Sequence, residues 1–161
     1  MVGPLARITL NHDNLSDGAK QLLKGTKLKI PDYSPYMNNV AQAIEILHCI
    51  EKSMEIIENL KIKNENVDVT PRAGEGFGVT EAPRGTLYHH YKINEKGIVE
   101  WINIITPTAQ KLKNIEADVK EFLPQILDKS KEQIIFELEK LIRAYDPCMS
   151  CSAHFLDVKF V

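Results

Sequence analysis

Two cysteines near the end of the chain, Cys148 and Cys151, have a spacing that metal ligands often have. They lie in the stretch Asp-Pro-Cys-Met-Ser-Cys-Ser-Ala-His, which ends at His154. Two thiolates separated by two residues can bind one soft metal ion, and an imidazole nearby can join them. A closed four-ligand zinc site would need a second pair of thiols, and the remaining cysteine, Cys49, has no partner near it in sequence. The motif therefore predicts half of a metal site.

A second residue capable of chemistry is Arg84, in the turn-forming sequence Glu-Ala-Pro-Arg-Gly that begins at Glu81. A guanidinium cannot ligate a metal, but it keeps its charge and donates five hydrogen bonds. Beside an anionic metal centre it could stabilise ligands, orient a small substrate or assist proton movement. His90, Glu81 and Thr108 could supply further polar contacts around such a site. The alternative interpretation of this arginine is an ion pair on the surface.

Length and composition are those of one ordinary globular domain. The chain has 161 residues, of which 43% are hydrophobic and 26% charged, enough to bury a core. A formal net charge of −2 gives no support to nucleic-acid binding. The sequence contains no apolar run of membrane-spanning length and no signal-peptide pattern at its N-terminus. Three cysteines do not suggest a secreted disulfide framework, so we expect a cytoplasmic protein without a membrane span.

The first half of the chain predicts helices. Residues 1–10 open with apolar residues and indicate either a short buried strand or a chain cut from a longer protein. Ser16 is expected to cap a short helix that runs to Leu23 and ends at Gly25. The longest helical pattern covers residues 37–61, and its apolar residues predict a stripe that faces the core: Val40, Ile44, Leu47, Met54 and Ile57. His48 and Cys49 lie on this helix, and we assign neither to a site.

The middle of the chain predicts a small β-hairpin. Glycines cluster in residues 71–78, where no phosphate-loop pattern follows, and we expect them to form tight turns. A strand then runs to Ile93, residues 92–97 make a turn, and a second strand returns over residues 98–105.

Two further helices follow, one that starts at residues 106–108 and is broken near Pro124, and one over residues 131–144. Pro147 ends the last helix and places the cysteines in a loop. The expected fold is mainly α, a helical bundle with a small β-hairpin. The 37–61 and 131–144 helices should pack together, with the hairpin and the Arg84 turn near the cysteine loop.

Four segments together resemble one family, the nickel–iron hydrogenases, in the C-terminal part of their large subunit. The segments are Val-Gly-Pro-Leu-Ala-Arg ending at Arg7, Glu-Ala-Pro-Arg-Gly-Thr-Leu-Tyr-His-His ending at His90, Ile-Thr-Pro-Thr-Ala-Gln ending at Gln110, and Arg-Ala-Tyr-Asp-Pro-Cys-Met-Ser-Cys-Ser-Ala-His ending at His154. The sequences of these segments are most similar to those of the cytosolic multisubunit group of cofactor-F420-reducing, methyl-viologen-reducing and sulfur- or NADP-linked enzymes. The similarity extends from Val2 to the last residues.

The resemblance implies a role for each matching residue. Cys148 would be a terminal thiolate on nickel, and Cys151 would bridge nickel to an iron that carries cyanide and carbon monoxide. Arg84, with Pro83 beneath it, would lie over the metal pair and polarise hydrogen or accept a proton. Thr108 would donate a hydrogen bond to a cyanide. The implied reaction is the reversible heterolytic cleavage of H2.

The resemblance also implies how the end of the chain is processed. His154 would end the mature chain and could bind a structural magnesium ion. Residues 155–161 would be a short extension that a maturation endopeptidase removes after nickel insertion. Within residues 1–161 the family's other pair of thiolates has no counterpart, and Lys111 follows Gln110 where an asparagine is usual. The chain is thus expected to be the C-terminal portion of a large-subunit domain, incomplete and inactive when alone.

Partners follow from the same resemblance: a small subunit with iron–sulfur clusters, further electron-transfer subunits, the endopeptidase, and H2 as substrate. An alternative is a non-catalytic relative that serves assembly or interaction, but retention of both Cys148 and Cys151 argues against it. A thioredoxin-like redox motif is a third interpretation; such a motif opens a helix, whereas this one follows a helix. Without the rest of the subunit, an apolar face should be exposed, and we expect the isolated chain to self-associate.

Overall fold

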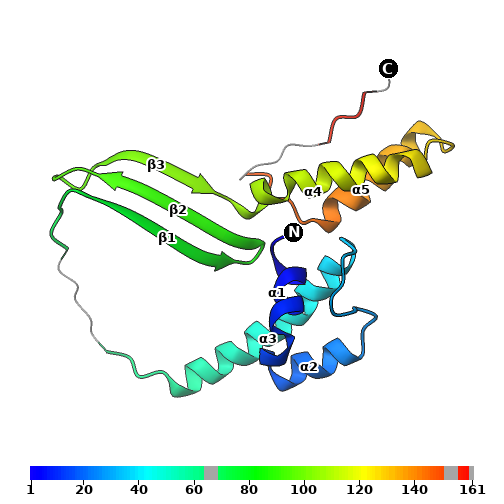
Figure 1. Ribbon diagram of the computed structural model, residues 1–161. Helices are drawn as coiled ribbons and strands as arrows, with labels where there is room; N and C mark the ends of the chain where they lie inside the picture. The colour runs from blue at the N-terminus through cyan, green and yellow to red at the C-terminus, as the bar shows by residue number, and fades with distance from the viewer. Residues whose placement is uncertain (64–68, 151–155, 160–161) are drawn as a thin grey trace.

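The computed structural model describes residues 1–63, 69–150 and 156–159. Its elements follow the order α1 (Pro4–Asn11), a short 3-10 helix (His12–Asn14), α2 (Asp17–Lys24), α3 (Met37–Asn59), β1 (Gly74–Ala82), β2 (Gly85–Ile93), β3 (Val99–Ile105), α4 (Pro107–Phe122), a second 3-10 helix (Leu123–Gln125) and α5 (Lys131–Ala144). Figure 1 shows three parts: the group α1–α3, the projecting sheet, and the pair α4–α5. The expected fold class, mainly α with a small β-hairpin, is confirmed, and the hairpin is part of a three-stranded antiparallel sheet.

The N-terminal segment forms helix α1, so the expectation of a buried strand over residues 1–10 is wrong. Pro4 occupies the first turn, where its fixed φ favours a helix and its missing N–H costs nothing. Leu5 and Ile8, three residues apart, are almost fully buried and face the same side. These two side chains pack with apolar residues of α2 and α3 in the core of this part of the molecule.

Helix α2 begins and ends where the sequence predicts, but its cap differs. Ser16 is the N-cap residue, yet its side chain makes no capping bond to the helix. The Ser16 N–H instead donates to Nδ1 of His48 at 3.0 Å, and the Ser16 hydroxyl lies 3.2 Å from the same atom. His48, which we assigned to no site, thus ties α2 to α3.

Only the first half of α3 lies in the core. Ile44 is fully buried and Val40 packs against the same cluster, whereas Met54 is 58% exposed and Ile57 is 71% exposed. The prediction of one continuous buried stripe is therefore wrong for the second half of the helix. In the described residues α1 and α2 cover the helix as far as Glu51, and residues 52–59 beyond it are exposed (Figure 1).

The sheet is an antiparallel meander in the order β1-β2-β3. The predicted hairpin of β2 and β3 is confirmed, with a turn in which the side chain of Asn94 accepts the N–H groups of Lys96 and Ile98. Strand β1 is a correction, because the glycines expected to form turns lie extended along it. Glycine weakens a strand, which is why its pattern did not predict one.

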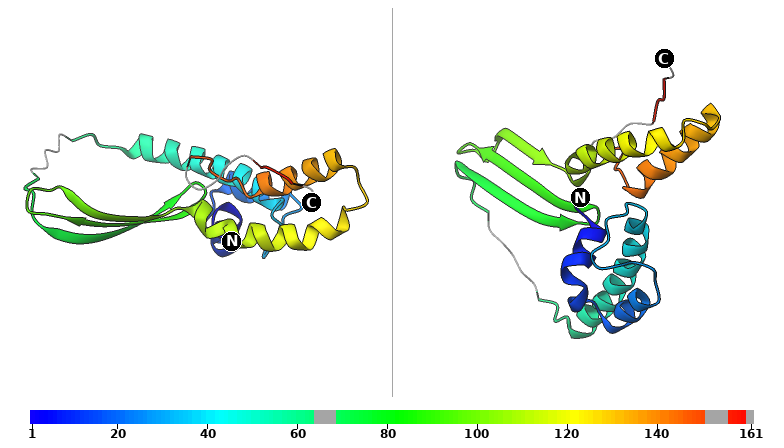
Figure 2. Two further views of the ribbon diagram at one scale, coloured as in Figure 1. Left: turned by 90° about the horizontal axis from the view of Figure 1, so that it is seen from above. Right: turned by 45° about the vertical axis from the view of Figure 1, so that its right-hand side comes forward.

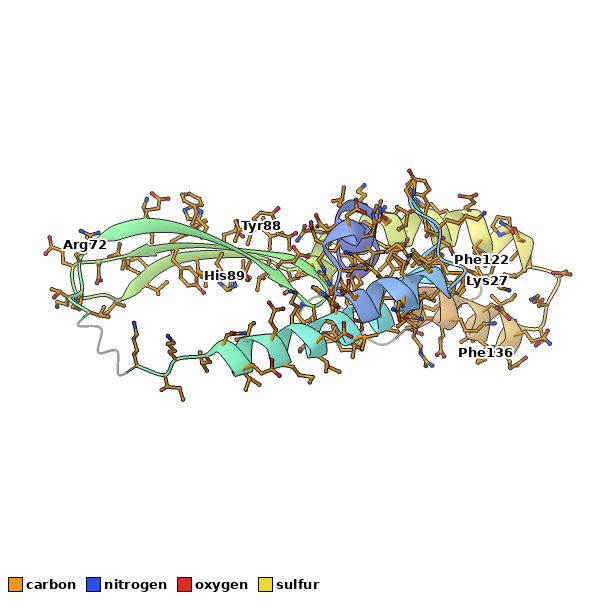
Figure 3. The ribbon with its side chains drawn as sticks, turned by 90° about the horizontal axis from the view of Figure 1, so that it is seen from below. Lys27, Arg72, Tyr88, His89, Phe122 and Phe136 are labelled. Carbon is orange, nitrogen blue, oxygen red and sulfur yellow. The ribbon has the colours of Figure 1, made fainter. Side chains whose placement is uncertain are left out.

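Both faces of the sheet are open for most of its length. Every residue of β3 is exposed, and so is β1 up to Glu81. Figure 2 shows the sheet extending away from the helices, and Figure 3 shows Tyr88 and His89 on its opposite sides. Only the end of the sheet at the β1–β2 turn is buried among the helices, at Gly85.

Helices α4 and α5 form an antiparallel pair. Helix α5 has the predicted bounds and starts with a capping box between Ser130 and Gln133. Helix α4 ends at Phe122, and Pro124 lies in the following 3-10 helix, as predicted. Ile126, Ile134 and Leu138 make the buried cluster of this pair, and Val158 packs against it.

Helices α3 and α5 meet at their ends, whereas we expected them to pack in a bundle. Asn38 Nδ2, in the first turn of α3, donates to the carbonyl of Ala144 at 3.0 Å. One turn later, Gln42 Nε2 donates to Oδ2 of Asp146 at 2.8 Å. The start of α3 therefore contacts the residues that lead into the cysteine motif. No helix in the described parts of the chain combines the length and apolar character needed to cross a membrane.

The unequal burial of α3 predicts unequal effects of two identical changes. Ile44→Ala should lower the free energy of unfolding by about 2–5 kcal/mol, because it removes a fully buried side chain. Ile57→Ala on the same helix should change it by less than about 0.5 kcal/mol. Urea unfolding followed by circular dichroism measures both, and similar losses for the two variants would contradict the assigned burial.

Candidate metal centre

The segment that carries the first cysteine, residues 145–148, is here called the cysteine strap. It starts at Tyr145, the C-cap of α5, and Pro147 prevents the helix from continuing. Asp146 has a φ of 50°, a left-handed conformation that aspartate tolerates better than most residues. Its N–H still donates to the carbonyl of Arg143 at 2.9 Å. This turn directs the chain away from α5 and sets the position of Cys148.

Arg84 contacts the strap directly. Its Nε lies 3.2 Å from the backbone oxygen of Asp146, to which it donates, and 3.0 Å from the carboxylate oxygen Oδ2 of the same residue. The arginine is in the β1–β2 turn, 62 residues earlier in the chain. The structure thus brings the Arg84 turn and the cysteine strap together. The contact is also the ion pair raised as the alternative, because the Arg84 side chain is 42% exposed and its partner is Asp146 of the strap.

Thr108 contacts the strap from the start of α4. It is 1% exposed, and its Oγ1 accepts the N–H of Cys148 at 3.1 Å. The hydroxyl proton is not used in this bond, so it can be donated to another acceptor. Gln110, two residues later in the same helix, donates to the carbonyl of Thr86 at 2.7 Å and ties α4 to the start of β2.

Two glycines let the N-terminus approach the Arg84 turn closely. Gly3 has a φ of 106° and Gly85 a φ of 137°, values that favour glycine. A Cβ at Gly3 would lie 2.6 Å from the backbone oxygen of Arg84, and one at Gly85 would lie 2.6 Å from Cγ2 of Val2. Side chains at either position would push the two segments apart.

Arg7 of α1 holds the same turn, and it uses all five of its N–H donors. Its Nε and one terminal nitrogen bind the carboxylate of Glu45 on α3. The other donors reach the carboxylate of Glu81 and the carbonyls of Ala82 and Pro83. Hydrogen bonds to the two glutamates raise the pKa of Arg7 although its burial acts in the opposite direction. The side chain fixes the backbone just before Arg84.

Lys111 of α4 holds the other side of the site. Only 1% of its surface is exposed, and its Nζ donates to the carbonyl of Tyr145 at 3.0 Å. Burial lowers the pKa of Lys111; the charge of Asp146 opposes this shift, and the charges of Arg84 and Arg7 add to it. Sequence inspection noted this lysine only as a departure from a family pattern.

The predicted site residues fall into three groups. Arg84, Thr108 and Cys148 lie together, with Pro83 beside them in the turn held by Arg7. Cys151 and His154 lie outside the described residues. Glu81 contacts Arg7 at the edge of the site.

His90, expected to contribute a polar contact, is not at the site. It lies on β2 opposite Phe77, stacks on that ring, and contacts Glu75 at 2.7 Å. It is five residues along the strand from Gly85, about 17 Å at the rise of an extended chain. The hairpin pattern predicted strand β2 but not where the strand lies relative to the helices. That is why the position of His90 was predicted wrongly.

The sequence contains a signal for one of the two residues that were missed. Arg7 belongs to the Gly-Pro-Leu-Ala-Arg stretch, and an arginine at the end of an apolar helical face indicates a partner for its charge. Lys111 gives no such signal, because lysines on helices are usually exposed. Within residues 1–63, 69–150 and 156–159, no group of three or more histidine, cysteine or acidic side chains could hold a metal ion. At the site, the described part therefore supplies the thiol of Cys148 and the polar groups around it; its other thiol, Cys49, lies on α3.

Comparison with known proteins gives a consistent result. A family model described as nickel-dependent hydrogenase matches residues 1–154. Sulfhydrogenase 2 subunit alpha of Pyrococcus furiosus is 38% identical over 159 residues, which cover 96% of this chain and 38% of the relative. Sulfhydrogenase 1 subunit alpha of the same organism is 36% identical over 157 residues, 96% of this chain and 36% of the relative.

A crystal structure agrees with these relatives. An NAD+-reducing [NiFe]-hydrogenase in the H2-reduced state superposes with a TM-score of 0.67 at 28% identity, over 95% of this chain and 35% of that one. The chain described here thus spans between a third and two fifths of the length of the proteins it matches.

The Arg7 contacts predict a large stability effect at one arginine and a small one at another. Arg7→Met should lower the free energy of unfolding by roughly 2–4 kcal/mol, because it leaves two carboxylates and two carbonyls without their donor. Arg143→Met removes an arginine that is 75% exposed and pairs with Glu139 one turn earlier on α5, and should cost less than about 0.5 kcal/mol. Thermal unfolding of both variants measures this; equal losses would show that the Arg7 contacts do not hold the turn.

Proposed function

Since the chain belongs to the nickel-dependent hydrogenase family, we propose that it forms the C-terminal part of a hydrogenase large subunit and supplies half of the thiolates of its metal centre. Cys148 and Cys151 would be the two thiolate ligands of this chain that hold the nickel–iron centre. The observation that carries this proposal is the meeting of three segments at one point: Arg84 and Thr108, from two other parts of the chain, both contact the strap that carries Cys148. Cys151 follows three residues later in the sequence.

The residues present fit such a group by their chemistry. Thiolates suit nickel and iron, and a fixed guanidinium suits an anionic centre. The unused hydroxyl proton of Thr108 suits an acceptor such as a cyanide nitrogen. Cyanide and carbon monoxide on the iron, and a magnesium ion at His154, belong to this proposal. When bound, the metal pair would supply an open coordination site for H2 and take up its electrons.

The chain's own groups would handle orientation and protons. Arg84 is held by the strap with its charge beside Asp146, so it can polarise a small substrate over the strap without moving. The carboxylate of Asp146 also accepts a bond from Gln42 at 2.8 Å, and it could hold a proton released there. Pro83, whose carbonyl accepts a bond from Arg7, would support Arg84 from the residue before it.

The remaining parts of the enzyme would come from other polypeptide segments. The chain matches less than two fifths of the length of its relatives, and we propose that the remainder of the large subunit supplies the other two thiolates. It would also cover the groove of about 1010 Å³ that runs from α3 to Pro83. A small subunit with iron–sulfur clusters and further electron-transfer subunits would remove the electrons, in the cytoplasm.

Assembly of the complete enzyme tests the proposal. The chain is co-expressed with the remainder of a related large subunit, the small subunit and the maturation proteins, and hydrogen-dependent dye reduction and nickel content are measured. Cys148→Ser should lose both nickel and activity. Arg84→Lys should keep nickel and lose activity about 100-fold or more, because a positioned charge is replaced by a mobile one. Lys113→Met is the control on the exposed side of α4, and full activity of the Cys148→Ser enzyme would overturn the proposal.

A second experiment concerns the end of the chain. The family match stops at residue 154, which supports treating the seven residues 155–161 as an extension removed by a maturation endopeptidase. Intact-mass measurement on the assembled, nickel-loaded enzyme should show a chain ending at His154, and the protein made without nickel should keep the extension. An unchanged mass in both preparations would contradict processing.

A further inference from the structure

Three side chains from outside the cysteine strap hold three of its backbone groups. The bonds are Lys111 Nζ to the Tyr145 carbonyl at 3.0 Å, Arg84 Nε to the Asp146 carbonyl at 3.2 Å, and the Cys148 N–H to Thr108 Oγ1 at 3.1 Å. Arg84 and Thr108 are already placed at the site by the proposed function. Lys111 binds the first of these backbone groups, the Tyr145 carbonyl, and the proposed function gives it no role.

Lys111 occupies a position where a charge is costly. Its surface is 1% exposed, and a buried ammonium is tolerated only when its donors have partners. Methionine has nearly the same length and would fill the space without this cost. Packing alone therefore does not require a lysine here, and the charge must serve a contact.

That contact is at the end of a helix. Tyr145 is the C-cap of α5, and the last carbonyls of a helix lack intrahelical donors and carry a partial negative charge. A cation from α4 satisfies one of them just before the left-handed turn at Asp146, whose φ is 50°. Without that bond, the Tyr145–Asp146 peptide group could rotate, and Cys148 would follow it.

The ammonium group of Lys111 also lies close to the N-terminal segment and the Arg84 turn. A Cβ placed on Gly3 would be 3.4 Å from Nζ of Lys111 and 2.6 Å from the backbone oxygen of Arg84. Lys111 therefore lies where the N-terminal segment, the Arg84 turn and the strap meet. Its charged neighbours are Asp146, which attracts it, and Arg84 and Arg7, which repel it.

We propose that Lys111 is a positioning residue that fixes the peptide group after Tyr145 and so presents the thiol of Cys148 for metal binding. This inference rests on the proposed function, because the metal ligated by Cys148 belongs to it. The positioning itself is a property of the chain without metal. It can therefore be measured separately from nickel binding.

The test uses the full 161-residue chain under reducing conditions. Lys111→Met is compared with Lys113→Met, which removes an exposed lysine two positions later on the same helix. Two quantities are measured: hydrogen–deuterium exchange at the Cys148 amide, and the thiolate-to-nickel charge-transfer band during titration with Ni2+. The melting temperature is recorded for each variant, and the alkylation rate of the exposed Cys49 serves as an internal reference.

Lys111→Met should raise the exchange rate of the Cys148 amide about tenfold and weaken Ni2+ binding about tenfold, with Cys49 and Lys113→Met unchanged. Wild-type exchange and Ni2+ binding in Lys111→Met would overturn the assignment and leave the proposed function standing. A wild-type band that persists in Cys148→Ser would instead count against Cys148 as a ligand, while amide exchange would still decide the role of Lys111.

A folding defect has its own control. If Lys111→Met lowers the melting temperature strongly, Lys111→Arg, which keeps the charge and the donors, is measured in its place. Slow exchange at Cys148 in Lys111→Arg, as in the wild type, would support the positioning role. Exchange as fast as in Lys111→Met would overturn it.

Discussion

The contact between Arg84 and Asp146 is the interaction on which the rest of the structure depends. It joins a turn at the end of an open sheet to a strap at the end of a helix, across 62 residues of sequence. Neither the turn nor the strap is itself a helix or a strand. The position of each is therefore fixed by hydrogen bonds from a neighbouring helix. Arg7 holds the turn through two carbonyls, and Lys111 holds the strap through one. Two separate helices thus set the distance between the guanidinium and Cys148.

The charges around this contact are unevenly distributed. Arg7 is neutralised by two glutamates, and its hydrogen bonds are all made within the protein. On the strap side, the carboxylate of Asp146 lies near both Arg84 and Lys111. The extra carboxylate at Arg7 therefore offsets the extra cation at the strap, and the three cations and three carboxylates of this cluster balance.

Local sequence patterns predicted those features whose cause is local. The bounds of α5 follow from its capping box and Pro147, and the β2–β3 hairpin follows from its alternating residues and the Asn94 turn. The closeness of Arg84 to the cysteine motif came from a family resemblance. The glycines of β1 were misjudged because their strand is stabilised by pairing with β2 and not by their own propensity. The burial of Lys111 depends on three segments at once, and no single stretch of sequence contains that information.

The second half of α3 has an apolar pattern that the described part of the chain leaves exposed. Its stripe has the spacing of a core helix, yet Met54 and Ile57 are exposed. A periodic apolar face reflects what the helix packs against in the whole folded protein, and this chain spans less than two fifths of its relatives. The groove lined by these residues continues to Pro83, beside Arg84. A segment that buried this apolar stripe would therefore also cover one side of the Arg84 turn. Burial of the stripe and exclusion of water from the turn would then occur together.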